Sequence, residues 1–317
     1  MFKENIKKMR HLIMKVPGVW YIVRKSRELK KRLFLGHLWP MQRRSLVQQQ
    51  RMSLRKFMGT FLHAGDVAFD IGANTGDTAL LMASCVAKSG LVYAFEPIPA
   101  CFAKLEQSAK NAWYRNLRAY PLALSDTSGN LTLLIDLREG GFASTIVTEH
   151  SEREATWHEA RYSPTSVTAT TLDAFCETSN IVPSFLKIDV EGAEEMVMRG
   201  GHKIIAKFHP LIWFECWCGT DNGAQINHNL GHFKQLSDLG YNFFLATLFK
   251  LNGEWIQEKN QINPAQLLRF EPKMLEHIPA MGCDILAATN DQIGLLHKCG
   301  LISEADAKNH ILGFLKT

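Results

Sequence analysis

The sequence predicts an α/β fold, a doubly wound sheet of seven principal strands preceded by a basic helical N-terminal arm. From residue 67 onward, short apolar runs alternate with helix-length amphipathic stretches, the pattern of β-α units around a parallel sheet. A glycine-containing turn follows the first run, where sheets of this kind bind ligands. With 317 residues, 46% of them hydrophobic, the chain can bury a substantial core.

The principal strands are predicted from apolar runs that end in turn residues. They cover residues 67–71, 91–95, 118–122, 185–190, 211–214, 241–246 and 284–288. Two further short strands are expected between the third and the fourth, at residues 131–135 and 166–170. The loop around Gly140 is expected outside the main sheet.

Composition divides the chain into an arm (residues 1–51), an α/β domain (52–290) and a helical C-terminal tail (291–317). The arm holds 14 Lys and Arg against two Glu, a net charge of +12. The other residues hold 22 Lys and Arg against 29 Asp and Glu, a net charge of −7. The basic character of the protein therefore belongs to the arm.

The arm leaves several functions open. Its apolar residues recur at helical spacing among the bases, which suits a surface helix that contacts anionic lipid or a protein partner. The same pattern suits a solvated helical lid packed on the domain. Specific nucleic-acid binding is not expected, because a basic arm alone attracts phosphate without regard to sequence.

Cysteine usage and hydropathy bear on the compartment. The seven cysteines have no regular spacing, which favours a reducing environment over a disulfide framework. No apolar run approaches the ~20 residues of a membrane-spanning helix, and residues 19–23 are too short for the core of a signal peptide. We expect a cytoplasmic protein, with peripheral attachment to the membrane as an alternative through the arm.

The first strand leads into a turn with two glycines, Gly72 and Gly76, around Asn74. Glycine lacks Cβ, so the backbone there can turn sharply and approach a bound molecule. A dinucleotide fingerprint would need a third glycine and amides that face a pyrophosphate. Here Asp70 precedes the turn, and its carboxylate would repel phosphate but suit the ammonium and sulfonium groups of S-adenosylmethionine. The turn therefore favours a methyl donor over a dinucleotide.

The second strand ends in an acid, Glu96, twenty residues after Gly76. A carboxylate at this place can accept hydrogen bonds from both hydroxyls of a ribose, in methyl-donor and dinucleotide sites alike. Pro97 and Pro99 stop the strand and start the next helix, which keeps Glu96 at the carboxyl edge of the sheet.

The third strand is expected to end near Ser125 and Asp126. A polar group at that edge would face the adenine ring. These residues are equally good turn formers before Ser128 and Gly129, so both interpretations stay open.

Four ordered blocks resemble the FkbM family of methyltransferases over about residues 60–290. The blocks are Phe69-Asp70-Ile71-Gly72-Ala73-Asn74-Thr75-Gly76, Phe95-Glu96-Pro97, Ala123-Leu124-Ser125-Asp126 and Leu186-Lys187-Ile188-Asp189-Val190-Glu191-Gly192-Ala193-Glu194. The resemblance implies a class I, Rossmann-like methyltransferase sheet with S-adenosylmethionine as the donor. It also implies, as the usual acceptor, a hydroxyl of a sugar or another small natural product.

The fourth strand carries two acids, Asp189 and Glu191, which strand alternation would send to one side near the carboxyl edge. An alcohol is scarcely ionised at neutral pH, so O-methylation benefits from a base or a metal that polarises its proton. We expect Asp189, with Glu191 beside it, to supply that base or a divalent-ion site. The alternative is structural: Asp189 caps the next helix and Glu191 pairs with Lys187.

The fifth strand ends in Glu215, which we expect to contact the substrate, because in similar proteins this glutamate lies close to the same edge. Trp213, Trp217 and Trp255 would either stack on a sugar ring or lie in the core. Cys216, Cys218, His228 and His232 are interpreted as buried thiols and surface histidines rather than zinc ligands, because no second spaced pair completes a set.

Two other functions remain open at this point. A nicotinamide-dependent oxidoreductase would share the sheet and the strand-end acid, and a non-catalytic scaffold would share the whole fold. The acceptor, the metal dependence and the oligomeric state carry no recognisable sequence code.

Overall fold

The computed structural model describes residues 58–136, 144–146, 162–218, 220–221, 224–225, 230–245, 267–270, 281–299 and 301–302. The chain forms two compact units, Met1–Arg55 and Lys56–Thr317, and the described residues belong to the second. The predicted basic arm, most of the predicted C-terminal tail and the loop around Gly140 lie outside the described residues.

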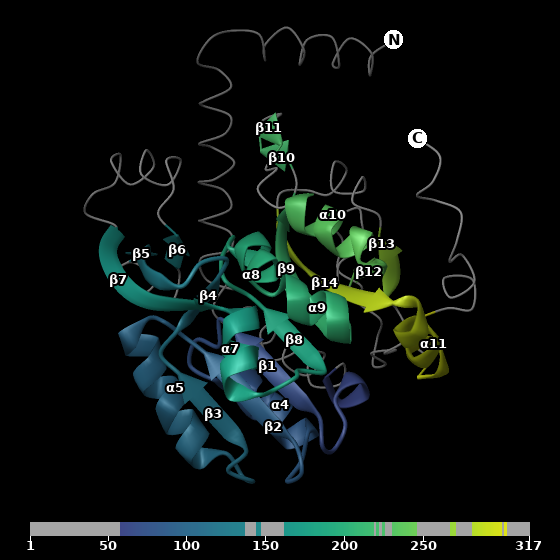
Figure 1. Cartoon of the computed structure of the whole chain (residues 1–317), viewed down its shortest axis with the longest axis horizontal. Helices are drawn as coiled ribbons and strands as arrows, with labels where there is room; N and C mark the ends of the chain where they lie inside the picture. The colour runs from purple at the N-terminus through teal and green to yellow at the C-terminus, as the bar shows by residue number, and fades with distance from the viewer. Residues whose placement is uncertain are drawn as a thin grey trace, which may run out of the picture. The chain divides into compact units, whose positions relative to one another are not determined.

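The centre of the second unit is a sheet of eight strands in the order β13-β12-β14-β9-β8-β1-β2-β3 (Figure 1). The strands are β1 (Val67–Ile71), β2 (Leu91–Phe95), β3 (Leu117–Tyr120), β8 (Phe185–Ile188), β9 (Leu211–Cys218), β12 (Tyr241–Leu245), β13 (Leu268–Phe270) and β14 (Met281–Thr289). From β3 to β9 neighbouring strands are parallel, whereas β14, β12 and β13 pair antiparallel in succession. The α/β class and all seven principal strands are confirmed.

The structure corrects the predicted sheet in several places. β9 continues to Cys218, so Glu215 lies within the fifth strand and not at its end, and β14 is longer than predicted at both ends. The third strand ends at Tyr120 and the fourth at Ile188, each two residues before its predicted end. The short edge strand β13 was not predicted, because three residues give too little periodicity to detect.

Helices lie on both sides of this sheet. They are α4 (Asp77–Cys85), α5 (Pro99–Asn111), α7 (Leu172–Ser179), α8 (Glu194–Gly200), α9 (His202–Phe208), α10 (Leu230–Asp238) and α11 (Asn290–Lys298). Apolar side chains of α7, α8, α9 and α10 form one core with alternate residues of the central strands, and Figure 1 shows α7 and α9 in front of those strands. Among the described helices, none is both long and apolar enough to cross a membrane.

The densest part of this core is aromatic. Phe175 of α7 meets the rings of Phe69, Phe95 and Tyr120 edge-on, at centroid distances of 5.8, 4.8 and 5.0 Å. Edge-to-face pairs at such distances are favourable beyond the area that they bury. This packing fixes β1, β2 and β3 beneath the turns that leave their carboxyl ends.

A second sheet of four strands, in the order β4-β7-β5-β6, follows β3 in the chain. Its strands are β4 (Ala123–Ser125), β5 (Gly129–Asp136), β6 (Ser144–Ile146) and β7 (Tyr162–Thr171). The two predicted short strands fall within β5 and β7. Leu133, Ile135 and Val167 of this sheet pack against Ile98 and Cys101, so the sheet rests on the start of α5.

Candidate active site

The turn between β1 and α4 has a left-handed backbone at three residues, Gly72 (φ 79°), Asn74 (φ 50°) and Gly76 (φ 91°). Gly72 and Ala73 donate their backbone N–H groups to the Phe95 carbonyl at 3.0 and 2.9 Å. These hydrogen bonds join the turn to the end of β2, so the first two strands share one rigid carboxyl edge.

At both glycines, other parts of the protein occupy the space that a side chain would need. A Cβ on Gly72 would lie 1.8 Å from the Asp189 carbonyl oxygen, and one on Gly76 would lie 2.9 Å from Leu105 of α5. Close approach was predicted at these glycines, but as an approach to a ligand. The structure shows that the backbone after β8 and the α5 helix take up this space.

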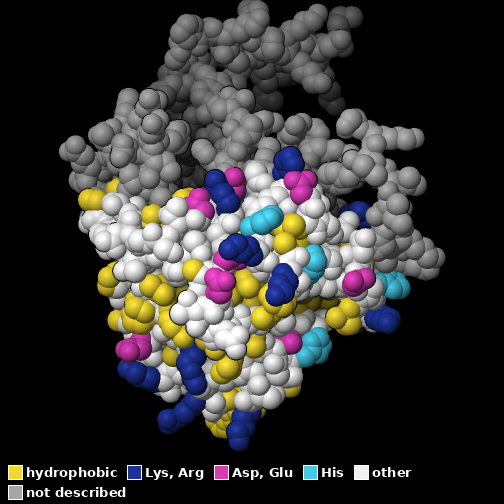
Figure 2. All heavy atoms as spheres, viewed as in Figure 1, with side chains coloured by type: hydrophobic (Ala, Val, Ile, Leu, Met, Phe, Trp, Pro, Cys, Tyr) yellow, Lys and Arg dark blue, Asp and Glu magenta, His cyan; other side chains and the backbone are white. Residues whose placement is uncertain are grey.

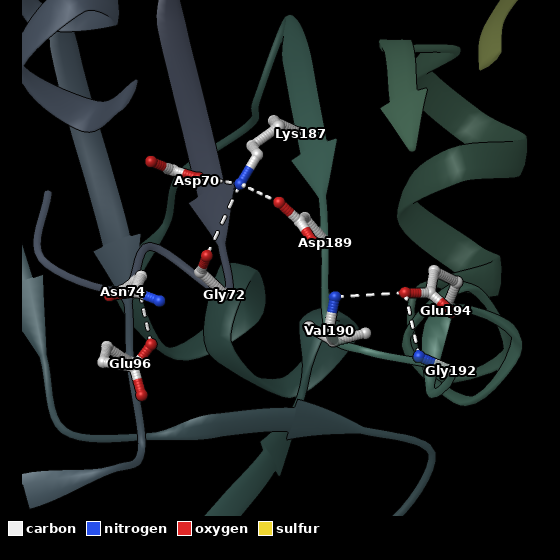
Figure 3. Close-up of polar contacts among 9 residues, drawn as sticks. All are labelled: Asp70, Gly72, Asn74, Glu96, Lys187, Asp189, Val190, Gly192 and Glu194. Carbon is white, nitrogen blue, oxygen red and sulfur yellow. Dashed lines mark hydrogen bonds and ion pairs between the residues drawn. The ribbon is translucent and has the colours of Figure 1, made fainter. Parts of the chain in front are cut away.

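Glu96 lies at the end of β2 with both carboxylate oxygens fixed by backbone amides. The backbone N–H of Asn74 donates to Oε2 at 2.8 Å (Figure 3). The backbone N–H of Ile98 donates to Oε1, also at 2.8 Å. Burial raises the pKa of Glu96 although these two hydrogen bonds lower it. Each oxygen keeps a further lone pair, and the contact with a ribose hydroxyl stays a prediction for this acid.

Lys187 of β8 joins the first strand to the loop after the fourth. Its ammonium lies 3.2 Å from Asp70 Oδ1, 3.0 Å from Asp189 Oδ2 and 3.4 Å from the Gly72 carbonyl oxygen (Figure 3). Burial opposes the charge on Lys187, but the two carboxylates outweigh burial and raise its pKa. Lys187 was not predicted as a site residue. The detectable signal was its place opposite a strand acid, because Asp70 and Lys187 are register partners on β1 and β8.

The expected contact between Asp70 and the cationic groups of a cofactor needs correction. Asp70 is fully buried, and its carboxylate faces the Lys187 ammonium inside the protein. Its charge is therefore neutralised internally, and Asp70 supports the turn from below instead of facing a ligand.

Three carboxylates gather just after β8 and within the neighbouring strand β9. One oxygen from each of Asp189, Glu191 and Glu215 lies within 4.8 Å of the others, and we call these three residues the acidic cluster. The sequence predicted that they meet, but strand alternation is not the reason. β8 ends at Ile188, and Glu191 has a left-handed backbone (φ 54°), so a turn brings it to Asp189.

The structure contradicts the alternative in which Asp189 caps the next helix and Glu191 pairs with Lys187. Lys187 pairs with Asp189 and with Asp70. The loop before α8 is held instead by Glu194, whose Oε1 accepts the N–H groups of Val190 at 3.1 Å and Gly192 at 3.3 Å (Figure 3).

Crowding of like charges shifts the acid-base properties of the cluster. Burial, with the nearby Asp189 and Glu194 carboxylates, raises the pKa of Glu191 to about 7. Burial, with Asp189, Glu191 and Asp284, raises the pKa of Glu215 to about 9. At neutral pH, Glu215 therefore holds a proton, whereas Glu191 is poised between its two forms.

Asp284 is a fourth acid at this site and was not predicted. It lies opposite Glu215 in the antiparallel pairing of β14 with β9, so both side chains share one face of the sheet. Burial and the Asp189 charge raise the pKa of Asp284 to about 6, although a hydrogen bond from Trp213 lowers it. Sequence spacing gives no sign of this neighbour, because β14 follows β9 only after several intervening elements.

The structure changes the setting of Ser125 and Asp126. Both were expected at the end of the third main strand, but Ser125 closes β4 of the smaller sheet and is fully buried. Asp126 forms an ion pair with Arg199 of α8, 3.5 Å from Nε. The adenine contact assigned to them remains a prediction.

The other side chains considered from sequence occupy the core where the structure describes them. Trp213 and Cys216 are buried, as expected for a core tryptophan and a buried thiol. His232 was expected on the surface, and this is wrong: it is fully buried against Phe214 and Phe233. Burial lowers the pKa of His232 to about 3, so the ring is neutral. His228 and Trp255 lie outside the described residues.

The geometry defines a class of protein. The central sheet has a glycine turn after its first strand, an amide-held acid after its second and the acidic cluster at its fourth and fifth. This arrangement indicates a Rossmann-like fold that binds its ligand at the carboxyl edge of the parallel strands. The sequence profile of the methyltransferase FkbM domain matches residues 70–243. The chain belongs to this family of methyltransferases, with S-adenosylmethionine as the methyl donor, and the resemblance stated above is confirmed.

Solved structures of methyltransferases resemble this chain in fold only. An FkbM methyltransferase from Methylobacillus flagellatus KT is 11% identical, with a TM-score of 0.38 over 70% of this chain and 43% of that one. A precorrin-6y C5,15-methyltransferase from Geobacter metallireducens GS-15 is 13% identical, with a TM-score of 0.40 over 76% and 87%. An S-adenosylmethionine-dependent O-methyltransferase from Thermotoga maritima is 13% identical, with a TM-score of 0.36 over 74% and 64%. This chain thus spans less than half of the Methylobacillus protein, and no curated protein sequence matches it.

Proposed function

We propose that this methyltransferase methylates a hydroxyl oxygen of a sugar, a glycan or another small natural product. The observation that carries this proposal is the acidic cluster beside the cofactor turn, and within it Glu191, the one residue of the three that is exposed. A base that titrates near neutral pH and can be reached from solvent suits the removal of a hydroxyl proton.

The site fits the methyl donor by charge and by hydrogen bonding. Glu96 accepts the backbone N–H of Asn74, and its remaining lone pairs can accept the hydroxyls of the ribose. The acidic cluster lies near the same edge. In the described part of the chain, Lys187 is the one lysine that pairs with these acids. The excess of negative charge suits a cationic sulfonium, although Asp70 itself is neutralised.

The acids of the cluster have different roles in this proposal. When bound, S-adenosylmethionine supplies a methyl group on a positively charged sulfur. Glu191 accepts the hydroxyl proton of the acceptor as the oxygen attacks. Asp189, which the sequence favoured as the base, is held by Lys187 at 3.0 Å and positions the loop. Glu215 is protonated near neutral pH and donates its one O–H to Asp189, so it helps to hold that carboxylate in place.

A divalent ion is the second way in which the acidic cluster could polarise a hydroxyl. Oxygen ligands lie about 2.1 Å from Mg²⁺ and about 2.4 Å from Ca²⁺, so opposite ligands are at most about 4.2 or 4.8 Å apart. The cluster oxygens lie within 4.8 Å of one another, which suits Ca²⁺ as they stand and Mg²⁺ after a small closure. Binding of Mn²⁺, Mg²⁺ or Ca²⁺ that Glu191→Gln and Glu215→Gln both abolish would favour this role over the base.

Ligand titration tests the cofactor site. Calorimetry on the purified full chain should show binding of S-adenosylmethionine and S-adenosylhomocysteine, and no binding of NAD. Glu96→Gln should weaken binding about tenfold or more, because its NH2 group would face one of the two backbone N–H groups that the carboxylate accepts. Glu177→Gln, an exposed change on α7, should leave binding unaltered. Tight NAD binding would instead support the oxidoreductase alternative.

Transfer of a labelled methyl group tests the reaction. The chain is incubated with labelled donor and a panel of glycans and small hydroxylated metabolites, and mass spectrometry locates the methyl group. Transfer to oxygen supports the proposal, whereas transfer to nitrogen or carbon contradicts it. Donor binding without transfer to any acceptor of the panel or of a cell lysate would favour a non-catalytic scaffold.

A further inference from the structure

Two loops at the amino edge of the main sheet carry exposed aromatic rings and a set of bases. Trp113 and Tyr114 lie between α5 and β3 and are 90% and 42% exposed. This edge is the one opposite the acidic cluster, because both loops precede parallel strands whose carboxyl ends form the site. A tryptophan in open water forgoes the burial that normally stabilises this residue.

The two loops are held together as one surface. Asn116 is buried, and its side-chain amide donates to the carbonyls of Ala83 at 2.9 Å and Ala87 at 2.7 Å. These hydrogen bonds fix the loop after α5 to the loop after α4, where Lys88 is exposed. The aromatic rings and Lys88 are therefore displayed by a backbone that is already in place.

The charged side chains of these two loops and their flanking residues are all basic. The segments 86–90 and 109–118 contain four exposed bases and no acid. At its border the exposed Glu106 of α5 pairs with Lys110 at 3.1 Å, so the excess positive charge comes from Lys88, Arg115 and Arg118. Figure 2 shows dark-blue and yellow side chains together at the lower end of the view, where Figure 1 places β2, β3 and α5. We call Lys88, Lys110, Trp113, Tyr114, Arg115 and Arg118 the amino-edge surface.

We propose that the amino-edge surface docks the protein on an anionic lipid bilayer. Tryptophan and tyrosine have an apolar body and a polar tip, and they gather where hydrocarbon meets headgroups. Lysine and arginine around them are attracted to the negative potential of such a leaflet. A protein docked in this way keeps the acidic cluster at the opposite edge of its sheet, away from the bilayer.

Vesicle binding tests the proposal with the full chain. Sedimentation with phosphatidylcholine vesicles that contain phosphatidylserine should recover the protein, and far less should sediment with phosphatidylcholine alone. Trp113→Ser should weaken partitioning about tenfold. Lys88→Glu/Arg115→Glu should weaken it by at least about tenfold. The charge-matched control Lys203→Glu/Lys234→Glu, on α9 and α10, should bind as the wild type does. The basic arm is present in every variant, so its own attraction is common to all of them.

Fluorescence separates this surface from the arm. Brominated phosphatidylcholine in the anionic vesicles should quench the emission of Trp113, taken as the wild-type spectrum minus that of Trp113→Phe. Unchanged affinity for S-adenosylhomocysteine shows that each variant is folded. Sedimentation without quenching of Trp113 means that another part of the chain makes the contact, and it overturns the proposal. Failure to bind vesicles overturns it too, and self-association that Trp113→Ser abolishes would then identify a second copy as the occupant.

Discussion

Lys187 is the residue on which the geometry of the site depends. Its ammonium is shared by Asp70 beneath the cofactor turn and by Asp189 at the acidic cluster, so one side chain links the two parts of the candidate site. Its side chain is only 10% exposed, and in such surroundings the loss of one partner leaves a buried charge without compensation.

Replacement of Lys187 should therefore destabilise the protein strongly. Lys187→Met leaves the buried Asp70 carboxylate unpaired, and we expect a loss of about 3–5 kcal/mol in the free energy of unfolding. Urea denaturation measures it, with the exposed Lys104→Met as the control. The double variant Asp70→Asn/Lys187→Met should regain much of the loss, because it removes both charges. Equal losses in the single and double variants would contradict the pairing.

Glu191 is the proposed general base, so its replacement should affect catalysis. Glu191→Gln should lower methyl transfer about 10²–10⁴-fold, the usual contribution of a general base, and leave donor affinity near the wild-type value. Because the carboxylate is the active form, the wild-type rate should rise with pH through about 7. Initial rates between mildly acidic and mildly basic pH measure this profile. A variant that keeps both the rate and the profile would remove Glu191 from the mechanism.

The turn between β1 and α4 shows how elements constrain one another. Gly72 is required because the chain after β8 passes directly against it, and its φ of 79° lies in the left-handed region. The turn and the chain that follows β8 thus form one packed unit. A sequence motif that identifies a cofactor site here serves chain packing as well.

Gly72→Ala should accordingly disrupt this unit. A methyl group 1.8 Å from the Asp189 carbonyl oxygen forces both backbones apart, and we expect a loss of more than about 2 kcal/mol in stability together with weaker donor binding. Gly294→Ala is the matched control. It lies inside α11 with open space around its Cα, so it should stabilise by about 0.5–1 kcal/mol. Thermal unfolding and calorimetry report both effects, and a fully stable Gly72→Ala protein would exclude the contact.

For the whole molecule, the gathered acids predict how stability depends on pH. The pKa values of Glu191, Glu215 and Asp284 are raised to about 7, 9 and 6 from ordinary values of 4.5, 4.5 and 3.8. The folded state therefore binds protons more tightly than the unfolded state, and this contribution is complete below about pH 4. It is lost as the pH rises toward about 9, by at most about 1.4 kcal/mol per pH unit for each group.

We expect the melting temperature to fall between about pH 6 and pH 9 as these acids ionise. Glu215→Gln should flatten that decline, because an amide cannot ionise beside Asp189 and Asp284. Bound cations that neutralise the acidic cluster should have the same effect. Differential scanning fluorimetry across this range gives the slopes, and a wild-type melting temperature that rises toward pH 9 would contradict the crowding of these acids.

The sequence determined the order of the elements and most of the residues at the carboxyl edge. β1 and β2 begin and end where their apolar runs begin and end, because turn residues bound each run and so fix both ends of the strand. Glycines, strand-end acids and their spacing are local signals, so the turn, Glu96 and the acidic cluster followed from them. The same signals carried the family resemblance.

Tertiary structure decided which side chains meet across strands and where each carboxylate points. Asp70 and Lys187 are 117 residues apart in the chain, and Asp284 reaches Glu215 only through an antiparallel pairing. The early end of β8 and the left-handed backbone at Glu191 overrode simple alternation. Local propensity specifies the elements because it acts through neighbouring residues. Charge pairing and pKa shifts depend on distances that exist only after the sheet has assembled.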